Sequence, residues 1–350
     1  MARSDRQRPA TLRTIAQAAG VDVSTVSRVL NGSAEDAQRA ASRETAEEIR
    51  RVAARLDYRP NPHATSLRTR RSNLVGVLVP RLSDLVLATV YEGIEDAAAR
   101  HGLATFVMNS HDRPERQRAR TELALSRRVD GLVFGDAHTG TAFLDEIAER
   151  RVPFVLVSRH AGGHPSVTCD DRLGGRLVAE HFLALGHRRV GVIAGEPFAS
   201  TGADRTAGFV DRYREAGFPV PGSHVVHCGF DASGGRDATE RLLRHDPAPT
   251  AVFAVNDFAA IGALGVLRDH GLRPGHDVAV AGYNDTPLAS ELPIPLTSVR
   301  SPMREMGARA LDLLVELLAG RTPRSERLPA TLAVRASTDP TRSLRTIAPS

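Results

Sequence analysis

The sequence predicts an α/β protein with a small helical head followed by a larger body built on parallel, doubly wound sheets. From Asn73 onward, apolar runs of strand length alternate with amphipathic helical segments, which is typical of such sheets. Before that point, apolar residues recur at helical spacing instead. The chain has 350 residues, which is enough for two or three domains with an ample core.

The positive charge is concentrated in the head. The whole chain carries a formal charge of +5, whereas residues 1–71 hold 14 arginines against eight acidic residues, so the rest is close to neutral. A basic end on a near-neutral body fits a phosphate-bearing partner. The chain contains no lysine, so part of the arginine content reflects coding bias, and the position of the charge carries the argument.

Composition also limits the cellular setting. Two cysteines, Cys169 and Cys228, are too few for a disulfide framework, and residues 1–12 contain no apolar run that could act as a signal sequence. No segment is long and apolar enough to span a membrane. We therefore expect a soluble cytoplasmic protein without a membrane partner.

Residues 11–31 predict two short helices joined by a tight turn. Thr11 can cap the first helix, Gly20 permits the turn, and Asp22 can cap the second helix. Apolar residues at helical spacing would face a common core, and they are Leu12, Ile15, Ala16, Ala19, Val26, Val29 and Leu30. Four residues remain on the outer face of the second helix: Val23, Ser24, Ser27 and Arg28. The pattern is typical of a helix-turn-helix, whose second helix enters the DNA major groove, although an ordinary helical hairpin has the same spacing.

The segment from residue 31 to residue 41 opens with Asn-Gly, which predicts a turn. A third helix is expected from Ser42, because apolar residues at i, i+3, i+4 and i+7 would close a three-helix core: Ile49, Val52, Ala53 and Leu56. Tyr58 would seal its end.

The basic segment 59–71 follows. Asn61 can cap a helix and Pro62 suits its first position, so residues 62–67 can form one short turn of helix. Such a short helix would be marginal in isolation and would order only against a partner. The alternative is a basic interdomain linker.

Eight strands are expected in the body: Leu74–Val79, Thr105–Met108, Gly131–Phe134, Phe154–Val157, Val190–Ala194, Val225–Cys228, Ala251–Val255 and Val278–Ala281. Helices between them include Tyr91–Arg100, Arg172–Leu185, Asp204–Ala216, Asp257–Asp269 and Pro302–Leu318. This alternation fits one large sheet or two smaller ones. In either arrangement, ligands bind beyond the carboxyl ends of the strands, where polar residues of both signs gather with few aromatics.

Five stretches in this order resemble the LacI/GalR family of transcriptional regulators. They are TIAQAAGVDVSTVSRVLNG, LDYRPNPHATSLRTRRSNLVGVLVP, GHRRVGVIAG, VNDFAAIGAL and VAGYNDT, within a resemblance that spans about residues 11–338. The resemblance implies a helix-turn-helix DNA-binding domain at 9–59, a hinge helix or linker at 60–71, and an effector-binding domain at 72–340. It implies that this last domain consists of two subdomains, like a periplasmic sugar-binding protein, approximately 72–160 with 286–320 and 161–285 with 321–340.

The resemblance further implies a cytoplasmic, nucleoid-associated homodimer or tetramer that binds double-stranded operator DNA, most commonly as a repressor. A sugar-like or nucleoside-like effector between the subdomains would switch operator affinity. Three residues would contact bases, since Arg28 can donate two hydrogen bonds to guanine, Ser24 can pair with several bases and Val23 can pack on a thymine methyl. Other DNA contacts implied by position are Thr11, Thr25, Ser27 and Asn31 on phosphates, and Asn61, Ala64 and the wedge residue Leu67 in the hinge.

For the effector, the resemblance implies that Arg205 binds ligand oxygens, that Phe230 closes over the ligand, and that a polar floor forms beneath it. The implied effector-binding set is Ser83, Asn109, Ser158, Arg159, Arg205, Phe230, Asn256, Asp257, Asn284 and Asp285. Each has a structural alternative, because Arg205 could form a surface ion pair and Asn256 or Asp257 could simply cap a helix. Asp170 and Asp171 are expected to cap the helix that follows them.

The chain departs from the family pattern in three places. The segment 31–42 is about five residues longer than usual. Asp84-Leu85-Val86-Leu87 stands where the family often has Asn-Pro-Phe-Phe, which removes an aromatic platform for a sugar ring. Asn284 occupies a position where sugar-binding members frequently carry a carboxylate. These differences point to a ligand other than a plain hexose.

An enzyme and a free-standing solute receptor are the alternative functions. Without lysine, neither a GxxxxGK phosphate loop nor a Schiff-base nucleophile is possible, and neither HExxH nor GxSxG occurs. His101, His160, His181 and His187 lack metal-ligand spacing. We therefore expect no enzymatic activity, no cofactor and no metal. A solute receptor would account for the body but not for the basic head.

Overall fold

The computed structural model describes residues 10–31, 34–58 and 71–339. The chain divides into two units, Met1–Asn73 and Leu74–Ser350, which we call the head and the body. The boundary agrees with the change of pattern at Asn73. The expected helix at 62–67, with Asn61, Ala64 and Leu67, lies outside the described residues.

The described part of the head is helical, with α1 (Leu12–Ala19), α2 (Val23–Asn31), α3 (Ala34–Ala40) and α4 (Arg43–Arg55). The predicted caps are confirmed: the backbone N–H of Thr14 donates to Thr11 Oγ1 at 3.2 Å, and that of Ser24 donates to Asp22 Oδ1 at 2.7 Å. Gly20 ends α1 with a φ of 66°, a conformation that favours glycine. The predicted apolar faces meet in one core built around Ile15, Val26 and Ile49, all fully buried.

The turn predicted at Asn31-Gly32 falls partly outside the described residues, and the segment that follows it forms a helix, α3, which the sequence analysis did not predict. Its sequence, AEDAQRA, is rich in helix formers and carries acidic residues in the first turn and Arg39 in the last, which suits the helix dipole. Ala37 is buried. The helix predicted from Ser42 is confirmed, and the Ser42 hydroxyl accepts a hydrogen bond from the N–H of Thr45 at 3.2 Å.

The body contains two six-stranded sheets, which decides between the one-sheet and two-sheet alternatives. The first has the order β11-β5-β4-β3-β1-β2 and the second β12-β10-β9-β8-β6-β7. All neighbouring strands are parallel except β10 and β12. The first sheet comprises β1 (Leu74–Val79), β2 (Ala104–Asn109), β3 (Gly131–Phe134), β4 (Phe154–Val157), β5 (Ser166–Cys169) and β11 (Glu326–Leu328). The second comprises β6 (Val190–Ala194), β7 (Val225–His227), β8 (Ala251–Ala254), β9 (Ala279–Asn284), β10 (Thr297–Arg300) and β12 (Thr331–Ala333).

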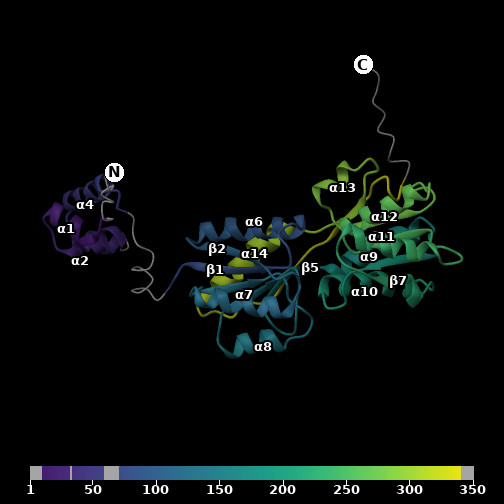
Figure 1. The fold of residues 1–350 in the computed structure, drawn as a ribbon, viewed down its shortest axis with the longest axis horizontal. Coiled ribbons are helices and arrows are strands. Elements are labelled where there is room, and N and C mark those ends of the chain that lie inside the picture. Colours follow the sequence, from purple (N-terminus) through teal and green to yellow (C-terminus); the bar gives the residue numbers. More distant parts are fainter. Residues whose placement is uncertain (1–9, 32–33, 59–70, 340–350) are drawn as a thin grey trace, which may run out of the picture. The chain divides into compact units, whose positions relative to one another are not determined.

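Helices cover both faces of each sheet (Figure 1). Around the first sheet lie α6 (Leu85–Arg100) with α14 (Met303–Leu318), and α7 (Pro114–Ser126) with α8 (Ala142–Glu149). Around the second lie α9 (Asp171–Ala184) with α10 (Ser200–Glu215), and α11 (Ala232–Leu243) with α12 (Asp257–Asp269), while the short α13 (Pro287–Glu291) precedes β10. The central strands are near-continuous apolar runs because both faces of each sheet are buried.

One close helix contact positions the site described below. A Cβ placed on Gly175 in α9 would lie 2.0 Å from the backbone oxygen of Arg205 in α10, and Gly208 makes the reciprocal approach to Arg172. Only glycine permits this spacing, so the two helices pack backbone to backbone. Their crossing therefore fixes the height of Arg205 above the second sheet.

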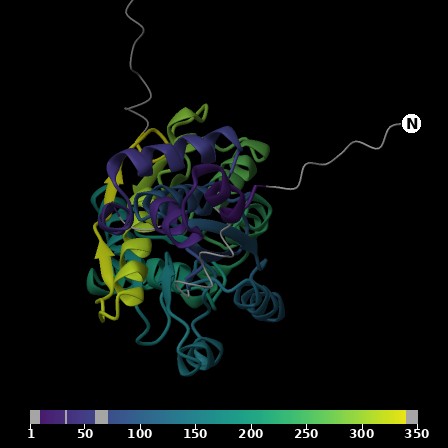
Figure 2. The same ribbon diagram turned by 90° about the vertical axis from the view of Figure 1, so that its left-hand side faces the viewer.

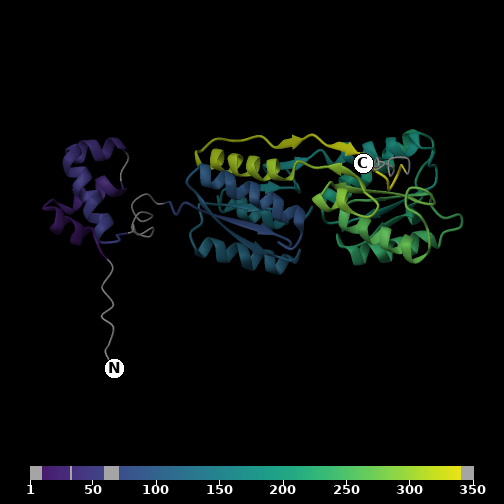
Figure 3. The same ribbon diagram turned by 90° about the horizontal axis from the view of Figure 1, so that it is seen from above.

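The predicted subdomain bounds are wrong at three of their ends. The resemblance implies that 161–285 and 321–340 form the second subdomain, but β5 and β11, which lie in these ranges, belong to the first sheet. It implies that 286–320 belongs to the first subdomain, but β10, which lies in this range, belongs to the second sheet. The chain crosses between the sheets after β5, after β10 and after β11, as the view from above shows (Figure 3). The end-on view shows the late, yellow strands along one side of the body (Figure 2), and β11 and β12 are edge strands. β11 and β12 have three residues each and no alternating pattern, so nothing in the sequence predicts these two strands.

Candidate functional site

The outer face of α2 is formed as predicted. Val23, Ser24 and Arg28 are exposed on it, whereas Val26 and Val29 on the opposite face are buried. Val23 has 38% of its surface accessible, so its methyl groups are available to a partner. Hydrogen bonding to Ser24 lowers the pKa of Asp22, so this cap stays charged at neutral pH. The face presents an apolar group, a hydroxyl and a guanidinium side by side.

Of the other predicted DNA contacts in the head, Thr11 is exposed, and Thr25, Ser27 and Asn31 are half-buried. Thr11 Oγ1 accepts the capping hydrogen bond at the start of α1, so its hydroxyl already has a structural role there. The remaining members, Asn61, Ala64 and Leu67, lie outside the described residues.

A cavity of about 410 Å³ opens between the two sheets of the body, beyond the carboxyl ends of their strands. This is the position expected for a ligand in doubly wound sheets. We call it the cleft. Seven of the ten predicted effector residues line it: Ser83, Ser158, Arg159, Arg205, Phe230, Asn256 and Asn284. Asn109, Asp257 and Asp285 do not.

Arg205 is buried and not a surface ion-pair partner. Its Nε donates to Asp171 Oδ1 at 2.7 Å and its Nη1 donates to the backbone oxygen of Val255 at 2.8 Å. The guanidinium carbon lies 3.7 Å from the centre of the Tyr283 ring. Burial raises the pKa of Asp171, and the positive charge of Arg205 opposes that rise. The ion pair therefore forms part of the cleft wall.

The two predicted caps of α9 have different roles. Asp170 caps the helix as expected, accepting from the N–H of Leu173 at 3.0 Å. The same prediction is wrong for Asp171, which lines the cleft and holds Arg205. The two neighbours diverge because Asp170 precedes the helix as its N-cap, whereas Asp171 is its first residue and is buried.

Arg159, on the other subdomain, is held in the same way. Its two Nη atoms donate to both carboxylate oxygens of Asp112, at 2.6 and 3.0 Å. Both residues line the cleft. Asp112 is not among the predicted site residues, although it lies four residues beyond the predicted strand Thr105–Met108. The His138 ring stacks on Phe198 at 4.3 Å beside this pair, and burial lowers the pKa of His138.

Asn256 lines the cleft, but both of its side-chain polar atoms serve the fold. Oδ1 accepts from the N–H of Ala259 as the cap of α12, at 2.9 Å, and Nδ2 donates to the backbone oxygen of Phe230 at 2.8 Å. The cap alternative is thus correct, and Asn256 also anchors the loop that carries Phe230. The Phe230 ring covers Gly195, where a Cβ would lie only 2.2 Å from it.

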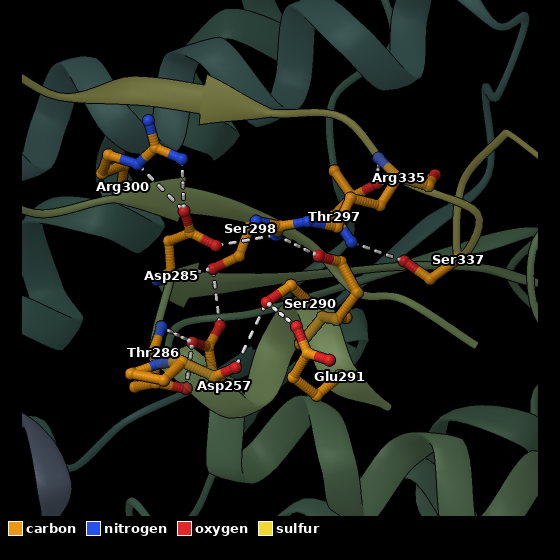
Figure 4. Close-up of polar contacts among 12 residues, drawn as sticks. Asp257, Asp285, Thr286, Ser290, Glu291, Thr297, Ser298, Arg300, Arg335 and Ser337 are labelled. Carbon is orange, nitrogen blue, oxygen red and sulfur yellow. Dashed lines mark hydrogen bonds and ion pairs between the residues drawn. The ribbon is translucent and has the colours of Figure 1, made fainter. Parts of the chain in front are cut away.

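Asp257 and Asp285 belong to a separate buried network, and their assignment to the ligand floor is wrong (Figure 4). Asp257 accepts hydrogen bonds from the N–H and hydroxyl of Thr286, at 2.7 and 2.9 Å, and from the Ser298 hydroxyl at 2.5 Å. Burial raises the pKa of Asp257 to about 6. Asp285 forms ion pairs with Arg300 at 3.0 Å and Arg335 at 2.7 Å.

Backbone geometry explains why only one residue of each neighbouring pair reaches the cleft. Successive side chains at the end of a strand leave on different sides, so Asn256 and Asn284 face the cleft while Asp257 and Asp285 face away. Asn284 and Asp285 also have positive φ angles of 102° and 51°, which reverse the chain there. Asn109 is structural as well, since its Oδ1 accepts from the N–H of Leu82 at 3.1 Å.

The cleft contains residues that the sequence analysis did not single out as ligand contacts. Two acidic residues at predicted strand ends, Asp84 and Glu196, line it together with Asp231. Phe198, Phe230 and Phe258 form an aromatic wall on the second subdomain, which corrects the expectation of few aromatics. The sequence could have indicated two of these rings, because Phe198 and Phe258 lie four and three residues beyond the predicted strands Val190–Ala194 and Ala251–Val255.

Among the described ranges, no group of three histidine, cysteine, aspartate or glutamate residues is arranged to hold a metal ion. No helix in the described part of the chain is both long and apolar enough to cross a membrane.

A helix-turn-helix head and a two-subdomain body with a cleft together define a class of bacterial DNA-binding regulators. Comparison with known families agrees, since the description "Bacterial regulatory proteins, lacI family" matches residues 11–61 and "Periplasmic binding protein-like domain" matches residues 179–338. The chain is 31% identical to the HTH-type transcriptional regulator DegA of Bacillus subtilis (strain 168), over 94% of this chain and 98% of that protein. It belongs to the LacI family.

Two further similarities support this assignment. The HTH-type transcriptional repressor PurR of Haemophilus influenzae (strain PittEE) is 29% identical, over 88% of this chain and 90% of that protein. The crystal structure of the lac repressor dimer bound to operator and the anti-inducer ONPF superimposes with a TM-score of 0.86 at 28% identity, covering 95% of this chain and 100% of that one. The chain is therefore a DNA-binding transcriptional regulator of this family, and these relatives are regulators and not enzymes.

Proposed function

We propose that this protein is a repressor that binds its operator as a dimer, and that its affinity for the operator changes when a small molecule occupies the cleft. The observation that carries the proposal is the cavity of about 410 Å³ lined by both subdomains, in a chain whose head presents an exposed polar face on α2. A ligand that contacts both subdomains changes the free energy of their relative arrangement, which is what allosteric coupling requires.

In this proposal, α2 lies in the major groove and three residues discriminate bases: Val23, Ser24 and Arg28. Their exposure, together with the burial of Val26 and Val29 behind them, supports the assignment. Thr11, Thr25, Ser27 and Asn31 set the register through phosphate contacts. In the hinge, Asn61, Ala64 and Leu67 order against the minor groove of the operator, with Leu67 unstacking the central base step.

The proposed effector-binding set is reduced to the seven predicted residues that line the cleft. Two of them have buried polar atoms without a hydrogen-bond partner among the described residues, Ser158 Oγ and Asn284 Oδ1. Buried polar atoms of this kind are rare in proteins and are commonly satisfied by a ligand or ordered water. Both residues also have positive φ angles, of 64° and 102°, which is typical of strained functional positions.

The first test measures binding of the full-length protein to duplex fragments from its own genome, by fluorescence anisotropy across a salt series. We expect sequence-selective binding that weakens steeply with salt, because phosphate contacts release counterions. If no fragment is retained selectively, with or without candidate metabolites, the proposed function is refuted. The same experiment on gel-filtration fractions of known mass establishes whether the DNA-bound species is a dimer.

The second test is a thermal-shift screen of sugars, polyols, nucleosides and purines, repeated with the selected DNA. We expect one compound to raise the melting temperature and also to change DNA retention. Ser158→Ala serves as the cleft variant, because it removes an unpartnered hydroxyl without disturbing an ion pair, and it should weaken the ligand response while leaving ligand-free operator affinity unchanged. A response unaltered by this change would remove Ser158 from the site.

A further inference from the structure

We propose that the ligand of this cleft carries a protonated amine. The proposal rests on the proposed function of the cleft as the effector site and narrows the chemical class of its ligand. It depends on a difference between the two signs of charge that line the cavity: the interior cations are paired within the protein, whereas three carboxylates are not.

The two buried arginines have carboxylate partners. Arg205 is paired with Asp171 at 2.7 Å, and Arg159 holds both oxygens of Asp112. The side chains of both arginines are only 7% exposed. The charge of each arginine is therefore already balanced by a carboxylate, so an anionic ligand would gain less attraction from them than from an unpaired guanidinium. The other cationic groups that line the cleft, Arg81 and His111, are exposed and therefore surrounded by water.

Three carboxylates line the same cavity without forming an ion pair in the described part of the chain: the half-buried Asp84 and Glu196, which carry the argument, and the exposed Asp231. Asp84 accepts from the N–H of Val86 at 2.9 Å as the cap of α6, and Asp231 accepts from the N–H of Gly234 at 2.8 Å as the cap of α11. These backbone contacts orient the two carboxylates without an ion pair, although the charges of Arg159 and Arg205 partly oppose the rise in the pKa of Asp84 that burial causes.

Two of these carboxylates lie at the same end of the cleft. Glu196 follows β6 and Asp231 follows β7, and these two strands are paired neighbours in the second sheet. Burial, and then the charges of Asp231 and Glu196, raise the pKa of the Cys228 thiol to about 11. Asp84 lies on the opposite subdomain, at the start of α6, where burial raises the pKa of its carboxyl. A carboxylate that is costly to desolvate gains most from a ligand cation, because the cation supplies the missing countercharge as water leaves.

The uncharged groups of the cleft favour the same ligand. Asn284 is 4% exposed, and its Oδ1 has no hydrogen-bond partner among the described residues, so it offers an acceptor to an N–H or O–H donor. Phe198, Phe230 and Phe258 line the second subdomain beside Glu196 and Asp231. Aromatic faces next to carboxylates bind organic ammonium groups through cation–π attraction. A neutral polyol could donate to the same acceptors but would leave the half-buried Asp84 and Glu196 without an ion-pair partner.

The test compares ligands of similar size that carry an amine, only hydroxyl groups or a carboxylate, using the full-length protein at neutral pH. One set is glucosamine, glucose and glucuronate, and the other is putrescine, butanediol and succinate. Dissociation constants are measured by calorimetry, after a thermal-shift comparison at equal concentrations. We expect the amine of at least one set to bind roughly tenfold more tightly than its hydroxyl and carboxylate analogues, with an affinity that falls as salt rises.

Two variants locate the effect. Glu196→Gln and Asp84→Asn each remove one charge, and Asn can still cap α6, so the fold is preserved. Each should weaken amine binding by roughly tenfold while changing the binding of the hydroxyl analogue by less than about threefold. Glu149→Gln is the control, because it removes the same charge from an exposed position at the end of α8, outside the cleft, and should leave amine affinity unchanged.

The proposal is overturned if no amine in either set shifts the melting temperature, if a hydroxyl or carboxylate analogue binds at least as tightly as its amine, or if Glu196→Gln and Asp84→Asn do not affect amine binding. DNA retention measured in the same samples separates this failure from failure of the proposed function. A neutral or acidic compound that releases DNA would refute the proposal that the ligand is an amine and would support ligand-controlled DNA binding. An amine that binds through Glu196 without altering DNA retention would support the ligand class and refute the switch.

Discussion

The stability of the body should depend strongly on the carboxylate of Asp171, because this group neutralises the buried Arg205. The two groups lie 2.7 Å apart with side chains 4% and 7% exposed, so replacing Asp171 with alanine leaves a buried guanidinium without its countercharge. Removing one partner of a buried ion pair costs about 3–5 kcal/mol. Arg205 keeps the Val255 oxygen and the Tyr283 ring as partners, so we expect a loss near the lower end of that range.

The assay is urea unfolding of the wild-type protein and Asp171→Ala, followed by circular dichroism, with the free energy of unfolding extrapolated to water. Asp269→Ala is the matched control, because it breaks an exposed pair with Arg236 and should change stability far less. The double variant Asp171→Ala with Arg205→Met removes both charges and should recover part of the loss. If Asp171→Ala were no more destabilising than Asp269→Ala, the argument for a buried, energetically important pair would be refuted.

Three further predictions concern the head, the contact between subdomains and the helix crossing. Arg28→Ala should relax base preference at one operator position by about 1–3 kcal/mol in competition binding, whereas an equal loss on random DNA would contradict the base-reading role. His160 Nε2 lies 2.7 Å from Asp204 Oδ2, and this hydrogen bond raises the pKa of His160. The contact should therefore stabilise the body fully below pH 6.5 and less as the pH rises through the raised pKa. Urea unfolding of the wild type and His160→Gln should show a difference in unfolding free energy of less than about 1 kcal/mol, and only on the acidic side of that range. Gly175→Ala should destabilise the body by about 1–3 kcal/mol or more and weaken ligand binding with it, because the new Cβ would lie 2.0 Å from the Arg205 backbone oxygen; an unchanged melting temperature would contradict that packing.

The sequence predicts the helices of the head best, because there the capping residues and the spacing of the buried apolar residues indicate the same elements. Thr11, Gly20 and Asp22 have the roles that capping chemistry assigns them, and Ile15, Val26 and Ile49 meet in the core that their spacing indicates. α3 was missed because the Asn-Gly dipeptide predicts a turn locally, whereas the helix that follows is stabilised by packing of Ala37 against the other helices. Packing of that kind is not visible in a single short segment.

The cleft shows where sequence reasoning stops. Strand ends identify the right edge of each sheet, but they do not say which of two adjacent polar residues faces the ligand. Asn284 ends β9 and Asp285 follows it, yet the first lines the cleft and the second pairs with Arg300 and Arg335, which are 15 and 50 residues further along the chain. The pairing of Arg159 with Asp112 likewise joins residues 47 positions apart. Contacts of this range follow from the tertiary fold and have no local signature.

The three connections between the sheets of the body determine how it can move. Cys169 ends β5 and Asp171 begins α9, Arg300 ends β10 and Met303 begins α14, and Leu328 ends β11 while Thr331 begins β12. Such short spans permit rotation about a shared axis but little sliding or separation. Asp171 lies at the end of the first connection, so a molecule that shifts this carboxylate acts next to the axis of rotation. A small displacement there becomes a larger one at the far ends of both subdomains.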